Sequence, residues 1–415
     1  MASVSPFVPP LLKKRMLLCS LLVRRLLTLL AVLGIGLACD SLVSEGMAAD
    51  ERVPAAQVSG ISQKQLGQVR QWIEQLGADE FAVRERAASQ LVEVGLPVLP
   101  LLREAFAETR DPEKRLRAEQ LMRQLKAGDL QIKIDRFLAG NEVSFQGWEQ
   151  TQGVMGDSLG VRQLFVELMV AHPEVAMSLA GTPRDQYVAM EVAVGRVETR
   201  MHEQLKAPTR ADAIALLLPA RDPKVPVSEA VEGLMLTVLN QAAANMLHKD
   251  VQVGGPFDEV VADWINRSSV NNRAEVLFFA QEWRLARVLP LARQTLSEAS
   301  AVQSLGIAMQ YIAVFGSPQD GELVAPFLED SRVLSEQGGY GVDPVETHLQ
   351  DVAMATIAML NKVKLDAIGF EGATPHPLRG FVFEEIGFAA SKSLKRNEIR
   401  QRVKKRLEGD LPSEQ

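Results

Sequence analysis

Apolar residues recur every three or four positions along most of the chain, which is the spacing of one face of an α-helix. Residues 78–106, ADEFAVRERAASQLVEVGLPVLPLLREAF, show this spacing most clearly. Their apolar stripe consists of Phe81, Ala87, Ala88, Leu91 and Val94. Because arginine, glutamate and glutamine side chains occupy the opposite face, the stretch predicts an amphipathic helix that buries its stripe against other helices.

Turn signals divide this stretch into successive helices. Gly95 stands where a helix needs a left-handed terminating residue, and Pro97 stands where the next helix tolerates a missing N–H. Asp111 followed by Pro112 predicts the start of a third helix. The predicted apolar faces are Val98, Leu101, Leu102, Ala105 and Phe106 in the second helix, and Leu116, Leu121 and Leu125 in the third.

The same helix–turn pattern recurs. Four positions (Ala87, Leu91, Gly95, Pro97) are matched 221 positions later by Ala308, Ile312, Gly316 and Pro318. Closer by, Ala88, Gln90 and Leu91 are matched 30 positions later by Ala118, Gln120 and Leu121. A helix pair cannot bury its apolar stripe alone, so repeated pairs are expected to stack on one another.

Further helices are predicted between these ends from periodicity alone, at residues 161–171, 184–205, 211–218, 228–247, 257–266, 273–282 and 285–296. Strictly alternating runs of β-branched and aromatic residues are scarce, so few or no strands are expected. The composition agrees, because 47% of residues are hydrophobic but only 5% are aromatic. Such a core is typical of packed helices.

Two segments resemble the HEAT-like (armadillo-type) repeats of secreted bacterial proteins. The first, DEFAVRERAASQLVEVGLPVLPLL with the continuation DPEKRLRAEQL, has the VRERA helix pattern and the Gly-x-Pro turn. The second, LQDVAMATIAMLNKVKLDAIGF, matches a C-terminal segment at Asp351, Ala353, Ala355, Leu360, Gly369 and Phe370, with NK in place of the usual Thr-Gly. The resemblance covers about a third of the chain. It implies an all-α fold, an α-α superhelix or solenoid of antiparallel helix pairs.

The N-terminal segment has the features of an export signal. Five basic residues lie within positions 13–25, and an apolar run follows at residues 26–38. This run is shorter than a bilayer-spanning helix. Small residues at Gly36 and Ala38, or at Gly46 and Ala48, would suit cleavage to a soluble protein. Alternatively, GLAC resembles a bacterial lipobox in which Cys39 is lipidated, although Gly36 stands where that motif has leucine.

These patterns predict an exported protein, periplasmic or in the cell envelope, with seven segments. They are a signal peptide (1–38), a flexible tether (39–60), N-terminal HEAT-like helices (61–127), a central helical solenoid (128–330), a loop insertion (331–345), C-terminal helices ending in a basic helix (346–408) and a tail (409–415).

No motif for catalysis, cofactor binding or metal binding is found in the sequence. The five histidines are scattered, and neither a P-loop, a G-x-S-x-G elbow nor a dinucleotide-binding fingerprint occurs. Without residues 1–38 the formal charge changes from −7 to −12, which makes nucleic acid a poor partner. We therefore expect no cofactor, no metal and no catalytic residues.

The strongest charge feature lies at the C-terminus. Residues 392–406 contain eight basic residues and only Glu398 as an acid, a net charge of +7, with Ile399, Val403 and Leu407 four positions apart. Three interpretations remain: a terminal cap that rests against the acidic body, a helix that docks on an anionic membrane or wall polymer, or, least favoured, a contact with nucleic acid. In the second, the contacting residues would be Lys395, Arg396, Arg400, Arg402, Lys404 and Lys405.

The sequence favours a non-catalytic, envelope-located repeat scaffold that binds a protein partner. The main alternative is a structural, membrane-associated protein held by a lipidated Cys39, by the basic helix, or by both. An accessory or lyase-like enzyme is a third hypothesis, suggested by the resemblance because some HEAT-like repeat proteins handle chromophores.

Overall fold

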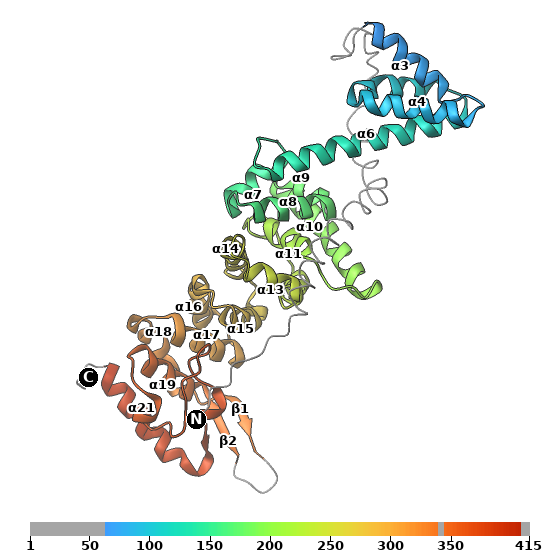
Figure 1. Ribbon diagram of the computed structural model, residues 1–415. Helices are drawn as coiled ribbons and strands as arrows, with labels where there is room; N and C mark the ends of the chain where they lie inside the picture. Colours follow the sequence, from blue (N-terminus) through green and yellow to red (C-terminus); the bar gives the residue numbers. More distant parts are fainter. Residues whose placement is uncertain (1–62, 339–343, 408–415) are drawn as a thin grey trace, which may run out of the picture. The chain divides into compact units, whose positions relative to one another are not determined.

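The structure, a computed structural model, describes residues 63–338 and 344–407 (Figure 1). The predicted signal peptide, the tether, Cys39 and the tail lie outside these residues. The chain divides into two compact units, 1–143 and 144–415. The described parts of both are mainly helical, which confirms the expected all-α class at that level.

The first unit contains α3 (Gln63–Gln75), α4 (Phe81–Val94), a 3₁₀ turn η1 (Leu96–Val98), α5 (Leu99–Glu108) and α6 (Pro112–Leu138). Helix α3 packs on α4, and α6 packs on both α4 and α5. Their shared core consists of Val69, Ile73, Leu76, Ala87, Leu91, Val98, Leu101, Leu102, Ala118, Leu121 and Leu125.

The turn chemistry of this unit is as predicted. Gly95 ends α4 with φ +80°, a backbone conformation that L side chains rarely adopt, and its N–H donates to the Leu91 carbonyl. Pro97 lies in the first turn of η1. The Asp111 carboxylate caps α6 by accepting from the Glu113 N–H at 3.0 Å, and Pro112 is the first residue of that helix.

Two residues predicted to be in the core are exposed instead. Phe81 is 63% exposed because it is the first residue of α4, where the guanidinium groups of Arg84 and Arg117 lie 5.7 and 5.9 Å from its ring centre. Leu116 is 47% exposed. It lies on the face of α6 turned away from the buried positions Ala118 and Leu121.

The second unit begins with α7 (Trp148–Met155), α8 (Leu159–Ala171), α9 (Pro173–Ser178), α10 (Pro183–Glu198), α11 (Arg210–Ala220), α12 (Glu229–Leu239), α13 (Ala242–His248) and α14 (Gly254–Ile265). Helix α11 packs against α8, α10, α12, α13 and α14. The residues of α11 from Ala211 to Ala220 are all buried, so this helix is the centre of the first half of the unit.

The unit continues with α15 (Arg273–Glu282), the 3₁₀ turn η4 (Ala286–Val288), α16 (Leu289–Glu298), α17 (Val302–Phe315), α18 (Gly321–Val324), α19 (Leu349–Leu360), α20 (Leu365–Ile368) and α21 (Ser393–Leu407). Helix α17 packs on α15, α16 and α19, and α19 packs on α21. Short 3₁₀ turns complete it: η3 (Val270–Asn272), η5 (Pro318–Asp320), η6 (Ala325–Glu329), η7 (Phe383–Glu385) and η8 (Ala390–Lys392).

Helix boundaries in this unit differ from the prediction at several places, of which two are the largest. The segment 228–247, predicted as one helix, is divided into α12 and α13 at Gln241, whose backbone is extended (φ −86°, ψ 161°). The segment 184–205 forms α10 followed by η2 (Thr199–Glu203), which has π-helical geometry. Helix α15, in contrast, has the bounds that periodicity predicted.

A three-stranded antiparallel sheet corrects the prediction of a plain loop at residues 331–345. Strand β1 (Val333–Gln337) pairs with β2 (Val345–His348), which pairs with β3 (Phe388–Ala389). Val333 lies opposite His348, and the register shifts before Ser335. The strands are short, and their hydrogen bonds depend on partner strands elsewhere in the chain. The pattern of apolar and polar residues within one such segment does not predict these partners.

Two parts of the chain share one local structure. The succession α4, η1, α5, α6 has the same order as α15, η4, α16, α17; both 3₁₀ turns have 3 residues, and both following helices have 10. Matching residues lie 190 positions apart: Val98, Leu99, Pro100, Leu101 and Arg103 correspond to Val288, Leu289, Pro290, Leu291 and Arg293. Val98 and Val288 are both 0% exposed, so the same positions are used for burial.

Gly316, the counterpart of Gly95 in the predicted repeat, also follows a helix and precedes a 3₁₀ turn with a proline. Its φ is −79°, so the expected left-handed geometry is absent there. Within residues 63–338 and 344–407, no helix is both long enough and apolar enough to cross a membrane.

Candidate functional site

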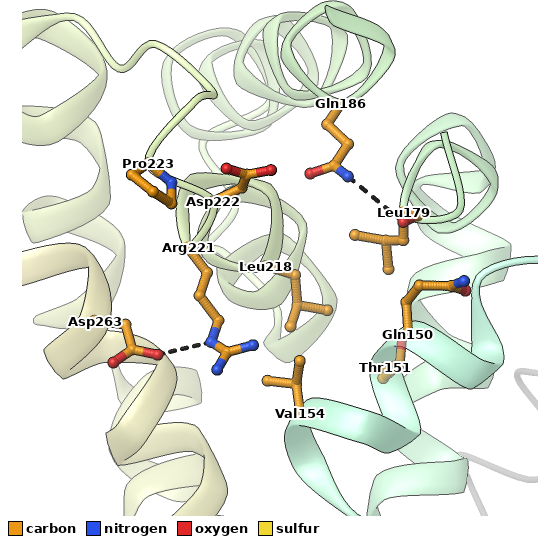
Figure 2. Close-up of a pocket in the computed structure, with 10 residues that line it drawn as sticks. All are labelled: Gln150, Thr151, Val154, Leu179, Gln186, Leu218, Arg221, Asp222, Pro223 and Asp263. Carbon is orange, nitrogen blue, oxygen red and sulfur yellow. Dashed lines mark hydrogen bonds and ion pairs between the residues drawn. The ribbon is translucent and has the colours of Figure 1, made fainter. Parts of the chain in front are cut away.

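A cavity of about 420 Å³ lies among α7, α10, α11 and α14 of the second unit (Figure 2). Its lining residues are Gln150, Thr151, Val154, Leu179, Gln186, Leu218, Arg221, Asp222, Pro223 and Asp263. They come from segments far apart in the sequence, so no local pattern predicts the cavity. Its size and its apolar floor with a few polar groups are typical of ligand sites.

The polar groups of the cavity are only partly engaged with the protein. Arg221 donates from Nε to Asp263 Oδ2 at 2.7 Å, and its two Nη groups have no partner in the described part of the chain. Asp222 uses Oδ1 to accept from the Lys224 N–H at 2.9 Å. Figure 2 shows the Arg221 guanidinium directed between Leu218 and Val154, with the amides of Gln150 and Gln186 on the other side.

Arg267 fixes the loop that forms one wall of the cavity. Its guanidinium donates to the backbone carbonyls of Ala220, Asp222, Pro223 and Val225, including one contact of 2.6 Å from Nη1 to Ala220 and one of 2.6 Å from Nη2 to Val225. Burial lowers the pKa of Arg267, partly offset by the charges of Asp222 and Glu232. The Ala220 carbonyl lies in the last turn of α11, where a helix leaves its carbonyls without helical partners, and the other three belong to the loop that follows.

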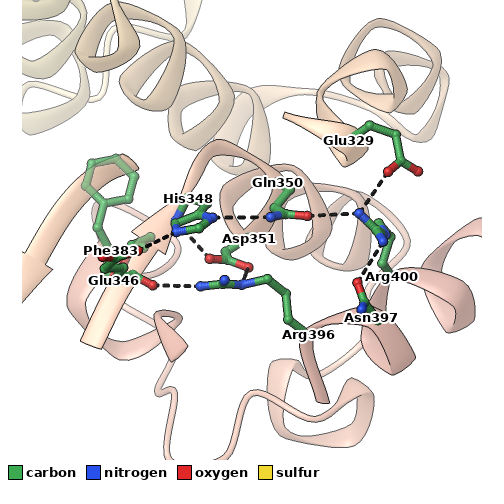
Figure 3. Close-up of polar contacts among 10 residues, drawn as sticks. Glu329, Glu346, His348, Gln350, Asp351, Phe383, Arg396, Asn397 and Arg400 are labelled. Atoms are coloured by element: carbon green, nitrogen blue, oxygen red, sulfur yellow. Dashed lines mark hydrogen bonds and ion pairs between the residues drawn. The ribbon is translucent and has the colours of Figure 1, made fainter. Parts of the chain in front are cut away.

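A second polar cluster surrounds the basic helix α21 (Figure 3). Arg396 is 8% exposed and donates from Nε to Asp351 Oδ1 at 2.9 Å and from Nη2 to the Glu346 carbonyl at 2.9 Å. Its guanidinium also lies 5.3 Å from the centre of the Phe388 ring. The prediction that Arg396 contacts an anionic surface is therefore wrong, because the side chain is buried against α19 and the sheet.

Asp351 connects this cluster to the start of α19. Its Oδ2 accepts from the His348 N–H at 2.8 Å, which caps the helix. Burial raises the pKa of Asp351 to about 6, although Arg396 and His348 act in the opposite direction. His348 Nε2 in turn lies 2.8 Å from Glu346 Oε2.

Most of the other predicted surface contacts also meet the body of the protein. Arg400 lies 2.8 Å from Glu329, which Lys404 also contacts. Lys395 lies 2.8 Å from Glu371, and Arg402 donates to the Ile368 carbonyl at 3.3 Å. Lys405 is exposed and has no acidic partner among the described residues, so its proposed role stays a prediction.

The apolar stripe of α21 faces the body as well. Ile399 is 1% exposed and Val403 is 3% exposed. Gly369 makes room for this contact, because a Cβ at that position would come within 3.0 Å of Ile399 Cδ1. The exposed side of the helix includes Leu394, Asn397, Glu398, Gln401, Arg402 and Lys405. Two of these residues are basic and one is acidic, so this side carries only part of the positive charge of the helix.

A buried pair outside both sites joins α8 to α11. His172 Nε2 lies 2.7 Å from Asp212 Oδ1, and the two residues are 1% and 0% exposed. Burial alone would raise the pKa of Asp212, but hydrogen bonds from His172 and the Thr209 N–H hold it below its usual value. Asp212 also completes the capping box of α11, so the pair has a structural role.

Metal-binding geometry is not found within residues 63–338 and 344–407, where no three His, Cys, Asp or Glu side chains are arranged around a common point. No protein-family profile, no curated protein and no solved structure matches this chain.

Proposed function

We propose that this chain is an exported, non-catalytic helical-repeat scaffold of the cell envelope that binds a protein partner. The observation that supports it best is the recurrence of one helix, 3₁₀ turn and helix unit at Phe81–Val94 to Leu99–Glu108 and at Arg273–Glu282 to Leu289–Glu298. Stacked repeats bury one face of each helix and leave others along the stack for binding.

A second argument comes from the use of charge in the C-terminal helix. Arg396, Arg400 and Lys404 contact Asp351 and Glu329 of the same chain, so these charges hold α21 in place. A surface that binds an anionic polymer would instead present them outward. The protein-binding hypothesis is therefore favoured over attachment to a membrane through this helix.

The envelope location is proposed from the N-terminal sequence. The basic residues followed by an apolar run at 26–38 are typical of an export signal. The lipidated form remains an alternative, supported by GLAC and Cys39. It would attach the same scaffold to a membrane by its N-terminus.

The experiment is tandem affinity purification of the tagged chain from separated cytosolic and envelope fractions after chemical crosslinking in cells. We expect the chain in the envelope fraction, together with one protein that rebinds the chain when both are purified. A chain that stays in the cytosol, or that never crosslinks to another protein, would contradict the proposal. A Cys39→Ser variant, compared with the parent for labelling by a fatty-acid analogue, decides between the soluble and lipidated forms.

A further inference from the structure

The cavity among α7, α10, α11 and α14 presents hydrogen-bond donors and acceptors around an apolar floor. Val154 and Leu218 form part of the floor. The amide of Gln150 offers donors and an acceptor, while that of Gln186 donates from Nε2 to the Leu179 carbonyl at 3.5 Å and keeps one donor and its oxygen. The Nη groups of Arg221 offer donors, and Asp222 offers an acceptor. A peptide main chain has the complementary groups, an N–H and a carbonyl on nearly every residue.

We propose that this cavity binds an extended peptide segment of the protein partner, with an aliphatic side chain on Val154 and Leu218 and its main chain bonded to the surrounding polar groups. The inference rests on the proposed function and adds the location and the chemistry of the binding site.

The charges of the cavity favour a neutral segment. Arg221 is already paired with Asp263 at 2.7 Å, and Asp222 adds a second carboxylate. A strongly anionic ligand would meet two carboxylates, and a strongly cationic one would compete with a guanidinium. Main-chain groups avoid both penalties, because they form hydrogen bonds without bringing net charge into the cavity.

The wall of the cavity is fixed before any ligand arrives. Arg267 holds the backbone of Ala220, Asp222 and Val225 through hydrogen bonds to their carbonyls. The neighbouring side chains Arg221 and Asp222 therefore start from a defined backbone. A preformed site loses less conformational entropy on binding than a mobile one.

The test is a titration of the purified full chain with the capped peptide acetyl-Ala-Leu-Ala-Ala-amide, followed by NMR. Free leucine is the matched probe, because it has the same side chain without the flanking peptide groups. Val154→Phe fills the floor of the cavity, and Gln186→Ala removes one amide from its edge. Gln204→Ala is the control, since Gln204 is exposed and does not line the cavity.

We expect the capped peptide to bind, and its Kd to rise about fivefold or more in Gln186→Ala and in Val154→Phe, with Gln204→Ala unchanged. Free leucine should bind about fivefold more weakly than the peptide. Unchanged unfolding midpoints would show that the variants fold; if Val154→Phe does not fold, Gln186→Ala decides alone.

Absence of peptide binding, or equal Kd values in Gln186→Ala and Gln204→Ala, would overturn the inference. The same variants separate it from the proposed function. If a crosslinked partner is recovered equally from the parent and from Gln186→Ala, the scaffold function stands and the cavity is not its site. If no partner is recovered from the parent, the proposed function itself fails.

Discussion

The guanidinium of Arg396 donates from Nε to Asp351 Oδ1 at 2.9 Å, and both residues are buried, at 8% and 0% exposure. The pair joins the C-terminal helix α21 to the first turn of α19. Removing one partner of such a pair leaves the other charge buried without compensation, which costs more than the pair itself contributes. The contact therefore makes the packing of α21 sensitive to single substitutions.

Arg396→Met should lower the free energy of unfolding by about 3 to 5 kcal/mol at pH 7, because it leaves the buried Asp351 carboxylate without its charge partner. Urea denaturation followed by circular dichroism measures this change. Lys395→Met is the matched control, since it removes the exposed ion pair with Glu371 and should leave stability unchanged. Equal effects of the two substitutions would show that the Arg396–Asp351 pair is not buried as described.

The buried carboxyl of Asp351 also predicts a pH dependence of stability. Burial raises the pKa of Asp351 from 3.8 to about 6, so between these values the folded chain holds a proton that the unfolded chain has released. The stability that Asp351 contributes is therefore fully present below pH 3.8, falls as the pH rises to about 6, and is constant above it.

Urea denaturation of the parent and of Asp351→Asn at a series of pH values measures the contribution of Asp351 to this pH dependence. Other carboxylates, such as Glu329, are present in both proteins, so their effects cancel in the comparison. The stability of the parent relative to the variant should decrease between pH 4 and about pH 6. A difference that increases over this range would mean that the folded-state pKa of Asp351 is lowered.

Leu91→Ala should destabilise the first unit by about 2 to 5 kcal/mol, because Leu91 is 0% exposed within a core of eleven residues. Leu116→Ala is the control with the same chemical change on α6, where the side chain is 47% exposed. Its effect should be about 0.5 kcal/mol or less in the same denaturation experiment. A small effect at Leu91 would place that helix face outside the core.

The basic helix should not bind lipid strongly, because most of its cations already contact the body. A chain beginning at residue 40 should sediment equally with anionic and neutral vesicles, whereas outward-facing cations would each add about 1 kcal/mol of attraction. Salt-sensitive sedimentation with anionic vesicles would contradict this. In that case two double variants would locate the binding. If sedimentation with anionic vesicles is lost in Lys392→Gln/Lys405→Gln but kept in Lys206→Gln/Lys249→Gln, exposed lysines of the C-terminal region bind the lipid.

Local features of the fold could be predicted from the sequence because their causes are local. Gly95 ends a helix, Asp111 caps one, and α15 follows its apolar period from Arg273 to Glu282. The exposure of Leu116 could not be predicted in this way, since periodicity finds a stripe but not the width that neighbouring helices cover. Strand β1 depends on pairing with β2, a separate segment of the chain, and was missed for a related reason.

For the functional sites too, the sequence predicts local features but not the contacts that depend on tertiary packing. The charge of α21 is visible in the sequence, but its partners Glu329 and Asp351 lie far from it along the chain. Nothing in the sequence joins Gln150 to Arg221, which line one cavity only because α7 and α11 both pack against α14 in the second unit. Sites of this kind depend on tertiary packing, and a single sequence does not encode them as a motif.

The most direct test of a protein-binding scaffold is site-specific photocrosslinking in cells, with a photoreactive residue placed in turn at Gln150, Gln186, Gln204 and Gln401. The first two line the cavity, and the last two are exposed elsewhere. We predict a discrete adduct with one protein from Gln150 and Gln186, and little or none from Gln204 and Gln401. Absence of an adduct at all four positions would contradict the account.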